Sequence, residues 1–425
     1  MTETASSTLP PAVATEVPGP RSRALAERLA RVEGRNVTCL DPPPIFWVRA
    51  AGANVWDADG NRYVDLGAGF GVAVAGHAHP RVVEAVRTQA ARLLHAMGDV
   101  HPPDVKVALL EALTARFPGG GAARAVLGSS GADAVETALK TALVATGRAG
   151  VVAFEGGYHG LALGALDATA RADFRAPFRA RLPGATAHAR YGDLASVERA
   201  AREAQAPVGA VLVEPLQGRG GERVPPPGFL AGLRDLCDRE GWLLVADEVY
   251  TGFGRTGRLF ACEHEDVVPD LLCVAKGLAS GMPISACVGR AEVMDAWPPS
   301  KGEALHTQTF LGHPPGCAAA LASMQVIDEE GLVARAEELG RAARDFLADA
   351  TAGSPRVREV RGRGLMIGIE CDGPETALRA CAEALGRGVI LLPSGDGRVL
   401  SVTPPLVIDR EALLEALAVT VRCIG

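Results

Sequence analysis

Short apolar runs alternate with helical patterns through the middle of the chain. Residues 151–154, 209–213, 242–246 and 271–275 are almost entirely apolar and carry no alternating polar positions. Residues 228–239 carry apolar side chains at helical spacing between two of these runs. Because strands buried on both faces of a sheet are apolar throughout, the pattern predicts a mostly parallel sheet with helices on both faces.

The two ends of the chain have a different pattern. Residues 54–65 alternate around Asp59-Gly60-Asn61, which is typical of a β-hairpin. Beyond residue 316 the pattern predicts a long helix, a strand at 365–370, another helix and a strand at 389–392. The first residues are rich in Ser, Thr, Ala and Pro, which favours disorder. We therefore predict a disordered tail over 1–20, a small α+β domain from 21–64 and 321–425, and a large domain over 65–320.

Composition narrows the range of functions. The 425 residues include 43 Lys and Arg against 50 Asp and Glu, a net charge of −7, which disfavours a nucleic-acid or anionic-membrane partner. The nine cysteines form no Cys-x-x-Cys pair and the nine histidines show no ligand spacing, so we expect no metal centre. We expect reduced thiols in a cytoplasmic protein, and no apolar run is long enough for a membrane span.

Two glycine-flanked segments follow strands, at the edge where α/β sheets bind ligands. Ser129, Ser130 and Gly131 open a helix, where free N–H groups and hydroxyls suit a phosphate; an ordinary serine N-cap is the alternative. Tyr158 stands among glycines after the next strand, where its ring either approaches a flat ligand or fills a plain turn. The adjacent His159 is interpreted as a packing residue, with a secondary contact to a bound ring as the alternative.

Two charged residues end apolar strands. Asp247 directly follows an apolar run, so we expect either a cationic partner, such as a protonated heterocyclic nitrogen, or a helix-capping role. Lys276 follows the next run and is either a desolvated nucleophile or a structural lysine. A phosphate site, a ring-stacking aromatic, a buried carboxylate and a buried lysine are together the parts that bind pyridoxal phosphate.

The sequence resembles the class III pyridoxal-phosphate-dependent aminotransferases, the family of ornithine, acetylornithine and 4-aminobutyrate aminotransferases. The resemblance extends from about residue 40 to residue 415 and rests on residues 247–257 (DEVYTGFGRTG), on Pro269-Asp270 and on Lys276-Gly277. It implies an α/β fold of the aspartate-aminotransferase type, fold type I. It also implies a ping-pong transfer of an amino group between an amine or amino-bearing small molecule and a keto acid or aldehyde.

The resemblance also implies roles around the cofactor. Lys276 binds it and shuttles protons, and Asp247 pairs with its ring nitrogen. Val249 and Tyr158 pack on opposite faces of its ring. Thr309 matches a residue that reaches the phosphate from the neighbouring subunit, which implies a homodimer with shared active sites. The remaining phosphate ligands are Ser130, Gly131 and Ala132.

On the substrate side, the resemblance is less complete. Glu214 matches a carboxylate near the substrate. Phe70 stands at a position where relatives have a side chain that helps to determine which substrate is bound. Most relatives have, three residues before Pro-Pro-Leu, an arginine that binds the substrate carboxylate and pairs with that glutamate, whereas this chain has Ser401. Arg398 is near in sequence, although strand alternation places it on the face opposite Ser401. A shift of register at the preceding glycine turn would let it serve, so Arg398 stays a candidate substrate-binding residue for the keto-acid partner. Tyr250 stands where many relatives have glutamine.

The missing arginine leaves two questions open. Residues 399–406 are similar to the α-amino-ε-caprolactam racemase branch, which also lacks it, so a racemase or epimerase of an amino compound is the alternative function. Without that arginine, Glu214 is expected to be an unpaired carboxylate that seeks a donor, which predicts an amine, polyamine, amino sugar or lactam-like substrate. The alternative is that an arginine from a neighbouring loop replaces the missing one.

Overall fold

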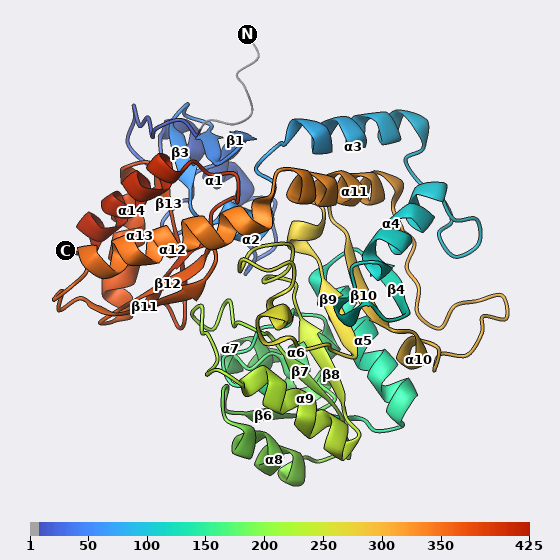
Figure 1. The fold of residues 1–425 in the computed structure, drawn as a ribbon. Helices are drawn as coiled ribbons and strands as arrows, with labels where there is room; N and C mark the ends of the chain where they lie inside the picture. Colours follow the sequence, from blue (N-terminus) through green and yellow to red (C-terminus); the bar gives the residue numbers. More distant parts are fainter. Residues whose placement is uncertain (1–7) are drawn as a thin grey trace.

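A seven-stranded sheet is the largest layer of the protein, whose computed structural model describes residues 8–425 (Figure 1). The strand order is β4-β10-β9-β8-β7-β5-β6. The five strands from β9 to β6 are parallel to one another, and β10 is antiparallel to both β4 and β9. The predicted, mostly parallel sheet is therefore present. Its strands are β4 (Ala123–Gly128), β5 (Gly150–Phe154), β6 (Thr186–Ala189), β7 (Val208–Val213), β8 (Leu243–Asp247), β9 (Leu271–Val274) and β10 (Ser285–Arg290).

Helices cover both faces of this sheet, as the apolar runs predict. They are α5 (Gly131–Thr146), α6 (Leu163–Ala168), α8 (Leu194–Glu203), α9 (Phe229–Glu240) and α10 (Ala291–Met294). Along β5, Val151 and Ala153 pack in a hydrophobic cluster with α5, whereas Val152 and Phe154 pack in another with α8 and α9. Both faces of β5 are buried, which is why its sequence shows no polar alternation.

The two ends of the chain combine in two smaller sheets. The predicted N-terminal hairpin is present, and C-terminal strand β13 pairs in parallel with β3 of that hairpin. Figure 1 accordingly places the blue N-terminal residues beside the orange and red C-terminal ones. The sheets are β1 (Trp47–Ala51), β2 (Asn54–Asp57), β3 (Arg62–Asp65) with β13 (Val389–Ile390), and β11 (Val357–Arg363), β12 (Met366–Cys371), β15 (Val399–Val402), β14 (Leu392–Ser394). The division into two domains with the boundaries given above stays a prediction.

Longer helices complete the structure around these sheets. Helix α11 (Pro314–Glu329) packs along both α3 (Pro80–Arg92) and α4 (Asp104–Thr114). Helices α12 (Leu332–Ala350), α13 (Pro374–Gly386) and α14 (Arg410–Ile424) cover the C-terminal strands. The short helices are α1 (Pro20–Leu29), α2 (Ala68–Gly71), α7 (Ala172–Arg175), η1 (Pro118–Gly120), η2 (Ala176–Arg181), η3 (Ala261–Glu265) and η4 (Lys276–Leu278).

The N-terminal segment differs from the expected disordered tail. Residues 1–7 lie outside the described residues, but residues 8–20 are hydrogen-bonded to the rest of the chain. Ala12 and Arg62 exchange two backbone hydrogen bonds of 2.9 and 2.8 Å, and the N–H of Leu9 donates to Asn54 Oδ1 at 2.7 Å. Pairing with β2 and β3 thus supplies the partners that composition does not reveal, and the expected tail does not include residues 8–20.

Two buried charged residues anchor the loop that follows β8. Glu248 accepts hydrogen bonds from the N–H of Cys262 at 2.8 Å and from the hydroxyl of Thr251. Burial raises the pKa of Glu248 to about 7, although these hydrogen bonds oppose the shift. The fully buried Arg255 donates to the carbonyls of Leu365 at 3.1 Å and Pro404 at 2.5 Å. The loop is therefore tied to the C-terminal part of the chain.

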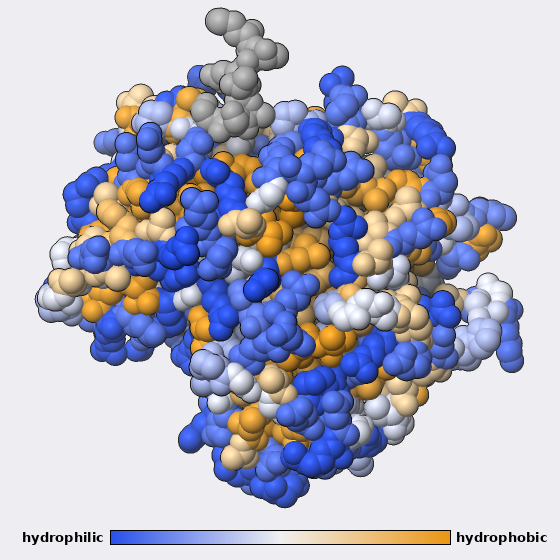
Figure 2. Space-filling model, in the orientation of Figure 1, coloured by the Kyte–Doolittle hydropathy of each residue, from blue (hydrophilic) through white to orange (hydrophobic). Residues whose placement is uncertain are grey.

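The surface is divided between hydrophilic and hydrophobic residues. On the face shown in Figure 2, hydrophobic residues lie in small groups between larger hydrophilic areas. Within residues 8–425, no helix is both long and apolar enough to cross a membrane.

We predict that Gly340→Ala destabilises the fold. Alanine normally stabilises a helix interior relative to glycine by about 0.5–1 kcal/mol. A Cβ on Gly340 of α12, however, overlaps the backbone carbonyl of Gly364 in the turn between β11 and β12. The expected loss is about 1–3 kcal/mol in the free energy of unfolding. Urea unfolding measures it, and Gly386→Ala, a helical site with open space around the Cβ, is the control that should lose nothing. Equal stability of both variants contradicts the packing argument.

We predict that Glu248 makes stability fall as the pH rises. Its folded pKa is about 7 and its ordinary value is 4.5, so the folded state holds this proton after the unfolded state has released it. The free energy of unfolding should therefore decrease between about pH 4.5 and pH 7 and level off above. Glu248→Gln should reduce the difference in stability between pH 5 and pH 8, measured by urea unfolding. Glu203→Gln, at the exposed end of α8, should leave that difference unchanged.

Candidate active site

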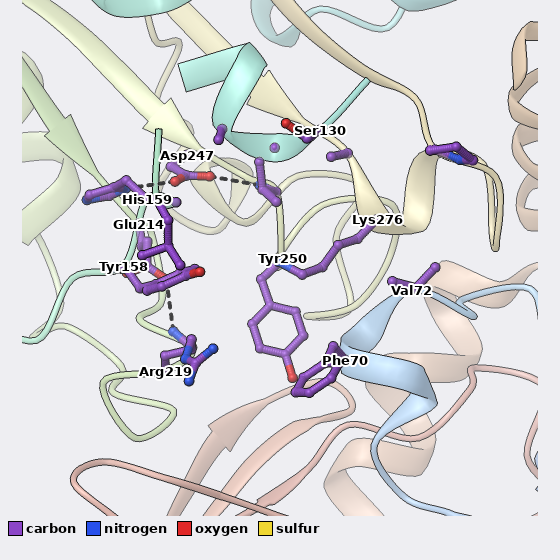
Figure 3. A pocket seen from close by; sticks show the side chains of 18 of the residues that line it. Phe70, Val72, Ser130, Tyr158, His159, Glu214, Arg219, Asp247, Tyr250 and Lys276 are labelled. Carbon is purple, nitrogen blue, oxygen red and sulfur yellow. Dashed lines mark hydrogen bonds and ion pairs between the residues drawn. The ribbon is translucent and has the colours of Figure 1, made fainter. Parts of the chain in front are cut away.

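A cavity of about 810 Å³ lies at the carboxyl edge of the large sheet (Figure 3). Its walls come from the segments after β4, β5, β7, β8 and β9, together with residues near positions 70, 281–284 and 392–401. Ten of the twelve residues expected at the site line it, whereas Thr309 and Arg398 do not. The ten are Phe70, Ser130, Gly131, Ala132, Tyr158, Glu214, Asp247, Val249, Lys276 and Ser401.

The start of α5 forms one wall of the cavity. Ser130 caps the helix by accepting the N–H of Asp133 at 3.2 Å, and the Asp133 carboxylate accepts the N–H groups of Ser129 and Ser130, both at 3.0 Å. The N–H groups of Gly131 and Ala132 lie in the first turn, where a helix offers no internal acceptor. The serine N-cap is therefore present, and Gly131 and Ala132 line the cavity. That their N–H groups bind a phosphate stays a prediction.

Asp247 and His159 form a buried pair at the end of β8. Asp247 Oδ2 lies 2.7 Å from His159 Nδ1, and its Oδ1 accepts the N–H of Val249 at 3.1 Å. Burial disfavours the charged imidazole, but the hydrogen bond to Asp247 and its charge outweigh this and raise the pKa of His159. His159 Nε2 is buried with no hydrogen-bond partner among the described residues. His159 is thus more than a packing residue, because it fixes the carboxylate of Asp247.

Lys276 lies directly after β9, on the wall opposite Asp247 in Figure 3. Its backbone has φ 34°, a conformation rare for residues with a side chain. Burial lowers the pKa of Lys276 against the charges of Asp247 and Glu214, and the charge of Arg219 adds to the lowering. Nζ lies 4.8 Å from the ring centroid of Tyr250. A lysine with a lowered pKa is more often neutral, which suits a nucleophile.

Tyr250 fills a narrow slot beside the cavity. Its hydroxyl lies 3.1 Å from Thr403 Oγ1. A Cβ added at Gly71 or at Gly218 would overlap the ring, so these glycines allow the ring to fit between two backbone segments. The position where many relatives have glutamine is therefore occupied by a ring whose hydroxyl is turned to the C-terminal part of the chain.

Glu214 does not meet the expectation of an unpaired carboxylate. Its Oε1 accepts the N–H of Tyr158 at 2.9 Å and its Oε2 accepts the N–H of Gly218 at 3.1 Å. Burial raises the pKa of Glu214 to about 7. Backbone donors thus take the place of the expected arginine partner.

Ser401 faces a second buried carboxylate that sequence reasoning missed. Glu222 lines the cavity, is 1% exposed, and has φ 47°. Its Oε2 accepts the hydroxyl of Ser394 at 2.6 Å, and the Ser401 hydroxyl also interacts with it. Burial raises the pKa of Glu222 to about 7. No local pattern marks this residue, because its surroundings come from β14 and β15.

Arg398 and Thr309 lie outside the cavity lining. Arg398 directly precedes β15, three residues before Ser401, so alternation turns it to the opposite face and the glycine turn does not shift the register. Thr309 is exposed, although the neighbouring Gln308 accepts the hydroxyl of Ser129 at 2.7 Å. Within residues 8–425, no group of His, Cys, Asp or Glu side chains could hold a metal ion.

Arg219 is the second residue that sequence reasoning missed. It lines the cavity, and its Cζ lies 4.8 Å from the ring centroid of Tyr158. A possible signal was its position five residues after Glu214, on a glycine-rich loop at the edge where ligands bind.

Comparison with known proteins identifies the family. Residues 38–424 match the family described as aminotransferase class-III. Acetylornithine aminotransferase from Methanopyrus kandleri is 45% identical over 376 residues, which cover 88% of this chain and 93% of that protein. 4-Aminobutyrate aminotransferase from Mycobacterium leprae is 41% identical over 441 residues, with 97% of each chain covered. The structure of ornithine aminotransferase from Toxoplasma gondii, with partial occupancy of pyridoxal phosphate, has a TM-score of 0.86 and 33% identity and covers 94% of this chain and 93% of its own. The chain therefore belongs to the class III aminotransferases, which are pyridoxal-phosphate-dependent enzymes.

Proposed function

We propose that Lys276 binds the cofactor covalently and that Asp247 pairs with its ring nitrogen. The observation that carries this proposal is the position of Lys276 Nζ in a cavity that also holds Asp247 and the start of α5. The sequence has four lysines, at 106, 140, 276 and 301, and Lys276 alone lines this cavity. The residues present fit pyridoxal phosphate, because they offer a carboxylate for its cationic nitrogen, a lysine for its carbonyl and N–H groups for its phosphate.

Each residue has a distinct task in this proposal. When bound, the cofactor withdraws electrons from the carbon that bears the amino group. Lys276 Nζ accepts a proton from that carbon and returns one. Asp247 keeps the ring nitrogen protonated, and His159 holds the carboxylate in place at 2.7 Å. Tyr158 and Val249 pack against opposite ring faces, and Gly131 and Ala132 donate N–H groups to the phosphate.

The proposed substrates are amino acids as donors and keto acids as acceptors, used in turn by a ping-pong mechanism. The expectation of an amine, polyamine, amino sugar or lactam-like substrate depended on an unpaired Glu214. Both oxygens of Glu214 accept backbone N–H groups instead. Two relatives are named for acetylornithine and 4-aminobutyrate, both of which carry a carboxylate. We also propose a cytoplasmic location, supported by nine cysteines that are all free thiols.

Product analysis tests this function. The enzyme is incubated with 4-aminobutyrate, N-acetylornithine or ornithine and with 2-oxoglutarate or pyruvate, and the products are identified by mass spectrometry. We expect glutamate or alanine to form in proportion to donor consumed. The alternative is a racemase, which the sequence around Ser401 suggests. A racemase would invert the configuration of a single amino acid in the absence of any acceptor. Racemisation without transfer contradicts the proposal.

We also propose that the protein is a homodimer with shared active sites. Large exposed apolar side chains gather on two segments near Thr309: Leu93, Leu94, Met97, Val100, Leu305 and Phe310. Contacts between these segments include a hydrogen bond of 2.8 Å from Thr307 to Asp99 and an edge-to-face contact of His95 with Phe310. A gathered apolar surface of this kind favours a protein–protein interface. Thr309 lies on this apolar surface and does not line the cavity of the same chain. This position is the one expected of a residue that contributes to the partner's active site.

We predict that Lys276→Ala abolishes covalent attachment of the cofactor. Borohydride reduction of the loaded wild-type protein should leave the reduced cofactor on the peptide that contains Lys276, detected by mass spectrometry. Lys276→Ala should carry no label and essentially no activity, because no other lysine lines the cavity. Lys301→Ala, at an exposed position, should be labelled like the wild type. A label on Lys106, Lys140 or Lys301 would exclude Lys276 as the attachment site.

We predict that two inactive variants restore activity when mixed. Lys276→Ala removes the cofactor lysine, and Thr309→Asp places a negative charge next to the partner's phosphate. In a mixed dimer, one of the two sites has both wild-type residues, so an equal mixture should recover about a quarter of wild-type activity. The control mixes Lys276→Ala with a chain that carries both substitutions, which leaves no intact site. If mass spectrometry verifies that the subunits have exchanged and no activity is recovered, the result argues against shared active sites.

A further inference from the structure

The backbone around Arg219 is fixed on both sides. Gly218 donates its N–H to Glu214 at 3.1 Å, and Gln217 exchanges two backbone hydrogen bonds of 3.0 Å with Arg223. The carbonyl of Arg219 accepts the N–H of Gly395 at 3.0 Å. The loop therefore presents this side chain to the cavity from a defined position, as Figure 3 shows.

Aromatic rings, and not a carboxylate, support the guanidinium. Its Cζ lies 4.8 Å from the ring centroid of Tyr158 and 5.7 Å from that of Phe174, and these two rings contact each other edge to face. In the part of the chain that the structure describes, no acidic side chain forms an ion pair with Arg219. By contrast, Arg234 and Arg361 each pair with two carboxylates. Ring support of this kind leaves the N–H groups of a guanidinium available to an anion.

The other charged groups that line the cavity are already engaged. His159 is bound to Asp247, and Lys276 is assigned to the cofactor under the proposed function. Glu214 and Glu222 accept hydrogen bonds from the backbone and from Ser394, respectively. Among the lining residues, Arg219 is the cation that has neither an acidic partner nor an assigned role. Its position also agrees with the contribution of its charge to the lowered pKa of Lys276.

We infer that Arg219 binds the carboxylate that the amino donor and the keto acceptor have in common. A guanidinium can donate two parallel hydrogen bonds to a carboxylate, which fixes both the position and the orientation of the substrate. In this chain, Ser401 occupies the place of the arginine that relatives use, so the carboxylate is recognised from the loop after β7. The inference rests on the proposed function and makes Arg219 a specificity-determining residue for carboxylate-bearing substrates.

Equilibrium binding of succinate tests the inference, because succinate has carboxylates but no amino or keto group to react. Titration calorimetry is performed on the cofactor-loaded wild type and on Arg219→Gln, Arg219→Lys and Arg202→Gln. Arg202 lies in the last turn of α8, exposed and outside the cavity, and is the matched control. We expect Arg219→Gln to weaken succinate binding about tenfold or more, Arg219→Lys to weaken it less, and Arg202→Gln to leave it unchanged.

Kinetics then separate recognition from chemistry. Arg219→Gln should raise the KM for pyruvate and 2-oxoglutarate about tenfold or more. The acceptor half-reaction with propanal, which has no carboxylate, should be unchanged when it is measured in a single turnover on enzyme that already carries the amino group. If Arg219→Gln does not fold, Arg219→Lys decides, because lysine keeps the charge but lacks the planar fork of N–H groups and should still weaken succinate binding. Wild-type protein that does not bind succinate, or variants with an unchanged Kd, overturn the inference. Arg219-dependent succinate binding without any amino transfer refutes the proposed function instead.

Discussion

The parallel alignment of β5, β7, β8 and β9 is the constraint on which the site depends. Parallel strands bring their carboxyl ends to the same edge of a sheet, and a cavity residue lies at or just after each of these four ends: Tyr158, Glu214, Asp247 and Lys276. These residues are far apart in the sequence, so the strand register sets their relative positions. Helix α5 adds its N-terminus to the same edge, because it begins directly after β4.

The second general feature of the site is that its buried carboxylates have hydrogen-bond partners close by. Asp247 pairs with His159, Glu214 accepts two backbone N–H groups, and Glu222 accepts a serine hydroxyl. Each of these carboxylates thus has hydrogen-bond partners without an arginine or lysine, although burial still raises the pKa of Glu214 and Glu222 to about 7. The two remaining cations, Lys276 and Arg219, are therefore free to face ligands in the cavity.

Sequence reasoning reached the sheet and most of the residues that line the cavity, because both depend on local patterns. Apolar runs mark buried strands, and the residue after each run is a local feature, as for Asp247 and Lys276. Alternation along β15 favoured the observed separation of Ser401 from Arg398, but Arg398 was still expected to bind substrate and does not line the cavity. Arg219 and Glu222 escaped notice, because their partners Phe174 and Ser394 come from distant segments. The same reason applies to residues 8–20, whose composition does not reveal their pairing with β3.

The pairing of β13 with β3 has a consequence for the order of folding during synthesis. Strand β3 leaves the ribosome early, but its parallel neighbour, Val389–Ile390, emerges only when almost the whole chain has been made. Until then, one edge of the hairpin has unpaired backbone groups that can pair with another nascent chain. The large sheet has no such requirement, because all its strands lie between residues 123 and 290. The carboxyl edge of the large sheet can therefore form on the ribosome before the N-terminal hairpin obtains its last strand.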